Sequence, residues 1–522
     1  MAIDERWNRL GDFAGFLNLD GIEFREYQYN IIKEILKCGN TLVVLPTGLG
    51  KTFIGAALIA DALARGKKAM LLAPTKPLAE QHYSTISKLL KLYEGELFLL
   101  IGSSKKKERQ EKENNAKVIV ATPQTVANDL KAGLLSLNGF DLVVIDECHK
   151  AVGKYAYTYV ANEAFLKGIP LVGLTASPGG DKEKIKRLVD TLNIKHIEAR
   201  VSTDADVSAY VMPKYMHIIM VDLSDRIKQM SGLLLPPMNE FMQNLNRMGL
   251  SPFKSAANVP KGRLIQLGKE IEKIQAKNYK FSAIMNYVKL LNLSHMYDLL
   301  QCEGMYPFMS YINSLENREK KSRSVEQLFK NSNVIAAKNL GLDAMKAGEE
   351  HPKVIAVLDT LRKVPGKSAI VFVQYRSTIK MLNEYLNNNG FRAMPFVGKT
   401  DGVTQAQQKQ VIEDFRARKF DVLVASSIGE EGLDIPNVDV VIFYEPIPNE
   451  IRNIQRRGRT GRFRPGDVYI LAARDTKDQA YLYISSRKER KMFEIIKKMN
   501  QDMARERSIE NRLSDGQKTL EL

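Results

Sequence analysis

The chain has 522 residues, 44% of them hydrophobic, and this length predicts about three or four domains with sizeable cores. Lys and Arg number 77 against 60 Asp and Glu, and the formal net charge of +17 favours a polyanionic partner, nucleic acid first and a membrane surface second. Three isolated cysteines (Cys38, Cys148 and Cys302) suggest neither a disulfide framework nor a metal site. The chain shows no signal peptide and no apolar run of the ~18 residues that span a membrane. We therefore expect a soluble intracellular protein.

Two parts of the chain alternate short apolar runs with helical patterns. In the first, from 41 to about 200, the predicted strands are TLVVL (41–45), AMLLAP (69–74), LFLLIG (97–102), KVIVAT (117–122), DLVVID (141–146) and LVGLTA (171–176). In the second they are SAIVFV (368–373), RAMPFV (392–397), DVLVAS (421–426), VDVVIFY (438–444) and GDVYILAA (466–473). Unbroken apolar strands between helices are typical of parallel sheets covered on both faces. We therefore predict two α/β domains, at 1–204 and 349–485.

Between them, at 205–348, helical spacing of Met, Leu and Tyr replaces the strand rhythm, which predicts a mostly helical insert. Residues 251 to 290 hold only two acidic residues and these basic ones: Lys254, Lys261, Arg263, Lys269, Lys273, Lys277, Lys280 and Lys289. A solvated helix face is one interpretation of such a run. We favour a surface that contacts phosphates, with Lys269, Lys273 and Lys277 gripping duplex nucleic acid.

The segment VLPTGLGKT (44–52) joins a predicted strand to a predicted helix. In this context, backbone N–H groups and a helix N-terminus face an anionic phosphate. Gly48 and Gly50 lack Cβ, so the backbone can curl closely round a ligand. Lys51 would reach the β- and γ-phosphates of a nucleotide, and Thr52 would place its hydroxyl on Mg²⁺. The alternative is a glycine turn before a core helix.

A second part of the predicted nucleotide site is VVIDECHK (143–150), where Asp146 and Glu147 follow a strand on the edge where the phosphate loop lies. An Asp there can hold Mg²⁺, and a Glu beside it can orient the water that attacks a phosphate. Cys148 and His149 would make a poor nucleophile and base, because adjacent strand residues point to opposite faces. The two segments together predict metal-assisted ATP hydrolysis.

The second α/β domain holds an arginine-rich segment, NIQRRGRTGRF (453–463). Phosphoryl transfer uses an arginine delivered from outside the phosphate-loop domain. Arg459 and Arg462 are spaced to present two planar guanidinium groups from one short helical turn. The alternatives are a basic loop that touches phosphates non-specifically and a basic cluster that resembles a targeting signal.

These segments resemble the motifs of the superfamily 2 helicases and translocases of the DExH type. In the first domain the resemblance rests on FREYQ (24–28), LPTGLGKT (45–52), APTKPLAEQ (73–81), ATPQT (121–125), DECH (146–149) and TASP (175–178). In the second it rests on VFVQYR (371–376), ASSIGEEGLDIP (425–436) and QRRGRTGR (455–462). Helicases often lack the first glycine of the general phosphate-loop pattern, where this chain has Leu45. The resemblance implies two RecA-like domains that bind ATP between them.

The resemblance also implies roles for single residues. Gln28 would read adenine, with Arg25 stacking on it, and the phosphates would lie on Thr47, Gly48, Leu49, Gly50, Lys51 and Thr52. Thr52 and Asp146 would hold Mg²⁺, while Glu147 would position the water. On domain closure the second domain would add Arg459, Arg462, Gln455, Gly432 and Asp434. Thr175 and Ser177 would couple the ATP site to the nucleic acid.

The bound strand is expected to cross both domains and to be held mainly through its phosphates, which carry no sequence information. The candidate contacts are Thr75, Thr122 and Gln124 in the first domain and Ser426 and Ser427 in the second. Each Thr or Ser could equally be a helix cap.

Within the superfamily, the chain resembles the branch of Dicer helicase domains, innate-immune RNA sensors and the archaeal Hef family with its Fanconi anaemia group M relatives. This branch carries a helical insert between the two RecA-like domains. DECH, LPTGLGKT and ASSIGEEGLDIP are most similar to the Hef family, which implies branched DNA (forks and Holliday junctions) as substrate, a role in replication repair and a chromosome-associated location in an archaeal cytoplasm. A translocase on duplex RNA, or a nucleic-acid scaffold with a structural ATP clamp, stays an alternative.

The last segment, 486–522, predicts a charged helical tail. Hef proteins carry a C-terminal nuclease of the XPF type, and this chain ends too early for one, so we expect that nuclease in a missing part or on a partner. ERKMFEI (489–495) begins like the nuclease signature ERKxxxD but ends in Ile495. We therefore interpret it as helix surface.

Overall fold

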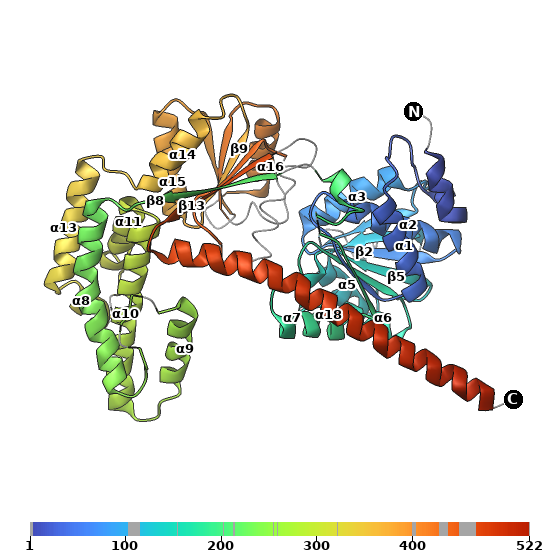
Figure 1. The fold of residues 1–522 in the computed structure, drawn as a ribbon, viewed down its shortest axis with the longest axis horizontal. Coiled ribbons are helices and arrows are strands. Elements are labelled where there is room, and N and C mark those ends of the chain that lie inside the picture. Colours follow the sequence, from blue (N-terminus) through green and yellow to red (C-terminus); the bar gives the residue numbers. More distant parts are fainter. Residues whose placement is uncertain are drawn as a thin grey trace.

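The computed structural model describes residues 4–102, 115–153, 155–201, 203–211, 214–253, 255–257, 259–320, 322–398, 403–426, 437–447 and 466–520. It has two parallel sheets, each covered by helices, and a helical insert packed beside the second sheet (Figure 1). The predicted fold class, two α/β domains with a helical insert between them, is confirmed.

The first sheet has seven strands in the order β3-β4-β2-β5-β6-β1-β7, all parallel. Their bounds are β1 Thr41–Val44, β2 Lys68–Leu72, β3 Leu97–Leu100, β4 Val118–Ala121, β5 Phe140–Ile145, β6 Leu171–Thr175 and β7 His196–Ala199. All but β7 coincide with predicted apolar runs. The sequence missed β7 because His196 and Glu198 interrupt its apolar run, and these two buried side chains contact each other at 2.6 Å.

Helices cover both faces of this sheet and enclose two apolar cores. They are α1 Glu26–Cys38, α2 Lys51–Ala64, α3 Lys76–Leu89, α5 Pro123–Lys131, α6 Ala156–Leu166 and α7 Lys182–Thr191, with short 3-10 segments η1 Glu5–Phe16, η2 Cys148–Lys150 and η3 Ser208–Tyr210. Trp7 of η1 is fully buried, and its ring lies 5.0 Å from that of Phe53 on α2. The helix that follows the phosphate loop is therefore enclosed between the sheet and the N-terminal segment.

The second sheet has six parallel strands in the order β10-β11-β9-β12-β13-β8. Their bounds are β8 Lys214–Val221, β9 Ala369–Phe372, β10 Ala393–Phe396, β11 Val422–Ala425, β12 Val440–Phe443 and β13 Gly466–Ala473. Strand β8 lies in the range predicted for the helical insert, yet it pairs with β13 along its whole length. The chain thus enters the second sheet before it enters the insert. As an edge strand with exposed residues, β8 lacks the unbroken apolar run that marks buried strands.

The insert itself is helical, as predicted, and has its own apolar core. Its helices are α8 Asp225–Arg247, α9 Lys261–Glu272, α10 Lys277–Cys302, α11 Met305–Glu316, α12 Arg323–Leu328 and α13 Ser332–Lys346. The second sheet is covered by α14 Pro352–Arg362, α15 Arg376–Asn388 and α16 Gln405–Arg416. Within the described residues, no helix has the length and apolar character needed to cross a membrane.

Helix α18, Lys477–Leu520, leaves the end of β13 and runs across to the first domain (Figure 1). The stretch ERKMFEI is helical, as predicted, but its Met492 is fully buried rather than on the surface. Met492 and Ile496 belong to a core of the first domain, and Met499 and Met503 pack against it. Apolar residues at this spacing form one stripe of a helix, and here the stripe faces the first domain.

Candidate functional site

The predicted phosphate loop connects β1 to α2, and its backbone is tightly curled. Gly48 and Gly50 have φ of 87° and 73°, a left-handed conformation that glycine adopts without strain. No side chain caps the N-terminus of α2, so its first N–H groups face the loop. The Nζ of Lys51, the first residue of α2, donates to the carbonyl oxygens of Leu45 (2.9 Å) and Pro46 (3.3 Å). A phosphate drawn to this cradle would replace those two carbonyl contacts.

Helix α1 packs against the phosphate loop through two adjacent side chains. The Tyr27 hydroxyl (2.8 Å) and the Gln28 Nε2 (3.2 Å) both donate to the carbonyl oxygen of Leu49. A Cβ on Gly50 would overlap Gln28 Nε2 and displace the end of that side chain, and the φ of 73° also favours glycine here. Arg25 lies close by, with its guanidinium 5.5 Å from the ring of Tyr210. Gln28 therefore helps to hold the phosphate loop in place. Its contact with adenine stays a prediction.

Asp146 follows β5 at the sheet edge that carries the phosphate loop, and its carboxylate is buried. Its Oδ2 lies 2.7 Å from Nε2 of His82, which comes from α3. Burial opposes ionisation of this carboxyl group, but the charges of His82 and Lys51 outweigh it, so the pKa of Asp146 lies below its ordinary value. An ionised carboxylate is the form that binds Mg²⁺. Sequence reasoning missed His82, which lies one residue beyond APTKPLAEQ and shows its role only through its contact in space.

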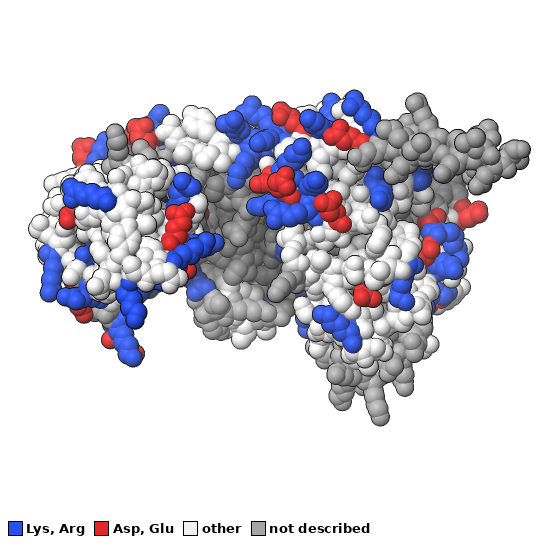
Figure 2. Space-filling model, turned by 90° about the horizontal axis from the view of Figure 1, so that it is seen from below, with Lys and Arg blue, Asp and Glu red and all other residues white. Residues whose placement is uncertain are grey.

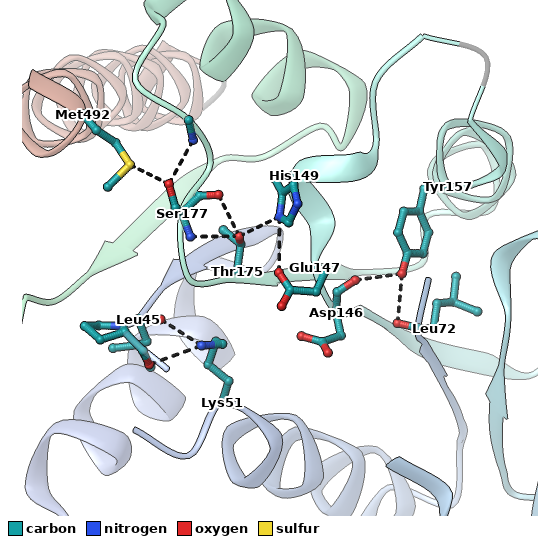
Figure 3. A network of polar contacts seen from close by, with 12 residues as sticks. Leu45, Lys51, Leu72, Asp146, Glu147, His149, Tyr157, Thr175, Ser177 and Met492 are labelled. Carbon is teal, nitrogen blue, oxygen red and sulfur yellow. Dashed lines mark hydrogen bonds and ion pairs between the residues drawn. The ribbon is translucent and has the colours of Figure 1, made fainter. Parts of the chain in front are cut away.

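Glu147 is the N-cap residue of η2 and has a φ of 48°, a conformation that costs energy in a residue with a side chain. His149 Nδ1 lies 3.3 Å from Glu147 Oε2 and 3.1 Å from the Thr175 hydroxyl oxygen (Figure 3). The Thr175 hydroxyl donates to the carbonyl oxygen of Ser177 (3.0 Å) and accepts from its N–H (3.1 Å). The Thr175 oxygen can therefore accept from His149 in the tautomer that carries its proton on Nδ1. Thr175 and Ser177, the predicted coupling residues, are linked to Glu147 through His149.

Cys148 is not a nucleophile in this arrangement. Its side chain is fully buried below β6, where a Cβ on Gly173 would lie 2.9 Å from its sulfur. Burial raises the pKa of the Cys148 thiol well above its ordinary value, so that the thiolate does not form at neutral pH.

The residues of the first domain fit a nucleotide with a divalent cation. A glycine cradle at a helix N-terminus suits phosphates, Thr52 follows Lys51 in the first turn of α2, and Asp146 is ionised. The predicted contributions of the second domain, Arg459, Arg462, Gln455, Gly432 and Asp434, lie outside the described residues. Their roles stay predictions.

The predicted strand contacts occupy the ends of strands. Thr75 and Thr122 are the N-cap residues of α3 and α5, but neither side chain caps its helix. Thr122 Oγ1 lies 2.8 Å from Thr125 Oγ1, and Gln124 Nε2 donates to Asn128 Oδ1 (3.1 Å). The hydroxyls of Thr75 and Ser426 are buried and lack a hydrogen-bond partner among the described residues. Ser427 lies outside the described residues. Nucleic-acid contact by these residues stays a prediction.

The basic surface of the insert divides into two kinds of side chain. Lys269, Lys273 and Lys277 are exposed, and no ion pair involves them in the described part of the chain. Lys289 instead lies over the ring of Phe241, 5.1 Å from its centre. Figure 2 shows more Lys and Arg than Asp and Glu over the lobe that the insert forms on the left. The three exposed lysines remain the best candidates for phosphate contacts.

One cluster of metal-ligating groups was not predicted. The ligand atoms of Glu34, Cys38 and His196 lie within 4.8 Å of one another, on α1 and β7. The cysteine spacing in the sequence gave no sign of it, because α1 and β7 meet only in the fold.

Comparisons with known proteins agree with these features. Residues 21–180 match the family model "Type III restriction enzyme, res subunit", and residues 352–464 match "Helicase conserved C-terminal domain". A putative ATP-dependent RNA helicase of Methanocaldococcus jannaschii is 37% identical over 92% of the chain and 61% of its own length. The ATP-dependent DNA helicase mph1 of Neurospora crassa is 31% identical over 88% of the chain and 41% of its own length. The chain thus spans only part of these relatives.

A solved structure corresponds to the chain more completely. The crystal structure of the Pyrococcus furiosus Hef helicase domain is 38% identical, with a TM-score of 0.71, and the match covers 90% of this chain and all of that one. The chain belongs to the superfamily 2 helicases, in the family of the Hef helicase domain.

Proposed function

We propose that this protein is an ATP-dependent DNA helicase or translocase that acts on branched DNA, such as forks and Holliday junctions. The observation that carries the proposal is the meeting of Lys51, the ionised Asp146 and Glu147 at one sheet edge (Figure 3). His149 Nδ1 lies within 3.3 Å of both Glu147 and Thr175, and Thr175 is hydrogen-bonded to Ser177. An ATP site connected to a second part of the molecule is what a motor requires.

In the proposed mechanism the phosphate loop and Lys51 hold the phosphates of ATP. Thr52 and Asp146 would hold Mg²⁺, which neutralises charge that develops on the phosphates, and Asp146 would leave His82 to do so. Glu147 would orient the attacking water. Arg459 and Arg462 would reach the site from the second domain, so hydrolysis would depend on closure of the two domains.

The choice of DNA over RNA rests on the relatives. The proteins of Neurospora crassa and Pyricularia oryzae are named DNA helicases, whereas the Methanocaldococcus jannaschii protein is named a putative RNA helicase. Branched DNA as the substrate rests on similarity to the Hef family. Phosphate contacts are common to both nucleic acids, so the chain must be tested with each.

The test is steady-state ATPase activity without nucleic acid and with single-stranded DNA, duplex DNA, forked DNA and duplex RNA. We expect forked DNA to stimulate most, and Lys51→Ala to remove the activity while fork binding persists. Strongest stimulation by duplex RNA would assign an RNA translocase. Fork binding without ATPase activity would indicate a scaffold with a structural ATP clamp.

We further propose that the four predicted segments act as a first motor domain, a DNA-gripping insert, a second motor domain and a tail. Charge reversal of Lys269, Lys273 and Lys277 to Glu should weaken fork binding by about 10-fold or more and reduce its salt dependence, because each phosphate contact releases a counterion. A matched control reverses three exposed lysines of α7, Lys182, Lys184 and Lys186. Equal affinity of the two triple variants would remove the insert from DNA binding.

A further inference from the structure

Helix α18 is anchored at its start to the second domain and to the insert. Asp478 is buried and accepts hydrogen bonds from Lys353 Nζ (2.8 Å) on α14 and from the N–H of Ala473 (3.3 Å). The neighbouring Lys477 lies 2.7 Å from the carboxylate of Asp298 on α10. The first turn of α18 is therefore held against the second domain and the insert.

Farther along, the same helix is docked on the first domain. From Asp478 to Met492 the helix advances about 21 Å at 1.5 Å per residue. Met492 and Ile496 are buried in the first-domain core, and the side-chain carbonyl of Asn500 accepts from the N–H of Ile197 on β7 (3.2 Å). A single continuous helix thus connects the two domains whose relative movement drives a motor.

The docking point touches the ATP site through a chain of polar contacts (Figure 3). The hydroxyl of Ser177 donates to the sulfur of Met492 at 2.9 Å. The N–H of Ser177 donates to the Thr175 oxygen, which lies 3.1 Å from Nδ1 of His149. The same Nδ1 lies 3.3 Å from Oε2 of Glu147, a close polar contact rather than a hydrogen bond, since this buried oxygen has no hydrogen-bond partner among the described residues. Every link is 3.3 Å or shorter and lies at the carboxyl ends of β5 and β6 or just beyond.

We propose that Met492 is a positioning residue for the ATPase reaction, which holds Ser177 and, through Thr175 and His149, orients Glu147. Helix α18 would then couple the position of the second domain to the group that orients the attacking water. This inference rests on the proposed function and extends it by naming a residue outside the helicase motifs. A residue that positions Glu147 should change the turnover rate rather than the affinity for ATP.

The test compares kcat and KM for ATP, with saturating forked DNA, in the wild type, Met492→Leu, Ser177→Ala and the double variant. Leucine keeps the apolar volume of Met492 but removes the sulfur acceptor, so the helix stays docked. We expect Met492→Leu to lower kcat about threefold, as the loss of one weak positioning hydrogen bond would, and to leave KM within about twofold. The double variant should be no slower than Ser177→Ala, because both changes break the same chain of contacts.

Met499→Leu is the matched control, since Met499 lies on the same apolar stripe without a recorded contact to Ser177 among the described residues. It should have the kcat of the wild type. Wild-type kcat in Met492→Leu, or losses that multiply in the double variant, would overturn the proposal.

A second readout separates this inference from the proposed function. If the wild-type chain shows no ATPase stimulation by any nucleic acid, the proposed function fails, and hydrogen exchange then decides the inference. Met492→Leu should speed exchange of the Ser177 amide within the 171–180 segment, whereas Met499→Leu should not. Unchanged exchange in Met492→Leu would overturn the positioning role.

Discussion

The buried Lys353 offers a sharp test of how the second domain holds α18. Its side chain is fully buried, its Nζ lies 2.8 Å from Asp478, and it lies 4.5 Å from the centre of the Tyr444 ring. Replacing it with Met keeps the apolar stem but removes the only charge that balances Asp478 at this contact distance among the described residues. Removal of one partner from a buried pair costs about 3–5 kcal/mol, because the other charge is left uncompensated.

The loss of stability caused by Lys353→Met should depend on pH, because the buried carboxyl group of Glu303 also interacts with Lys353. Burial raises the pKa of Glu303 to about 7, although Lys353 and the Thr378 hydroxyl both act to lower it. Without Lys353 the pKa of Glu303 rises further. An acid whose pKa is raised on folding loses stability as the pH rises, so Lys353→Met should be more destabilising at pH 8 than at pH 6. The difference should be about 1 kcal/mol or more.

Urea unfolding with two probes can locate the effect. The chain has one tryptophan, Trp7, which is buried in the first domain, so its fluorescence follows that domain alone. Far-UV circular dichroism follows the whole chain. Lys353→Met should lower the urea midpoint seen by circular dichroism and shift the Trp7 transition much less. Lys363→Met is the control, because Lys363 is exposed at the end of the same helix.

If Lys353→Met lowers the free energy of unfolding by less than about 1 kcal/mol, the reasoning is refuted, because the Lys353–Asp478 pair would then be no stronger than a surface ion pair. A loss that stays the same between pH 6 and pH 8 would refute the role of Glu303.

Two further predictions concern single side chains. Gly50→Ala should weaken ATP binding by about 10-fold or more, because its Cβ would displace the Gln28 side chain from the phosphate loop. Gly66→Ala is the control, since Gly66 shares the positive φ but has open space around it, and this variant should cost only about 1 kcal/mol of stability. Equal ATP affinity in the two variants would exclude a role of Gln28 in holding the loop. Burial, with Lys353 nearby, lowers the pKa of His351 to about 3. Below pH ~6.5, His351 is therefore protonated in the unfolded chain but stays neutral in the folded chain. The wild type should therefore lose about 2 kcal/mol between pH 6.5 and pH 5 relative to His351→Asn, measured by urea unfolding, and parallel pH profiles would contradict this.

Local patterns in the sequence were enough to locate most strands of the two sheets and to predict the candidate nucleotide site of the first domain. Apolar runs mark all strands except β7 and β8, because strands buried on both faces must be apolar throughout. The phosphate loop is equally local, since its glycines, lysine and helix start are contiguous from Gly48 to Thr52. Asp146 and Glu147 could be assigned because the end of a parallel strand fixes the edge on which they lie.

Tertiary structure alone decided how distant segments meet. The contact of His82 with Asp146 spans 64 positions and that of Ser177 with Met492 spans 315, and no local pattern encodes such pairs. The pairing of β8 with β13 and the burial of Met492 likewise follow from which surfaces remain to be covered once the sheets have formed. The sequence by itself predicted an ATP site at the strand ends, because each of its two segments is a short run of neighbouring residues. Only the tertiary structure shows that α18 reaches this site from the second domain, because an apolar stripe on a charged helix does not reveal which surface will cover it.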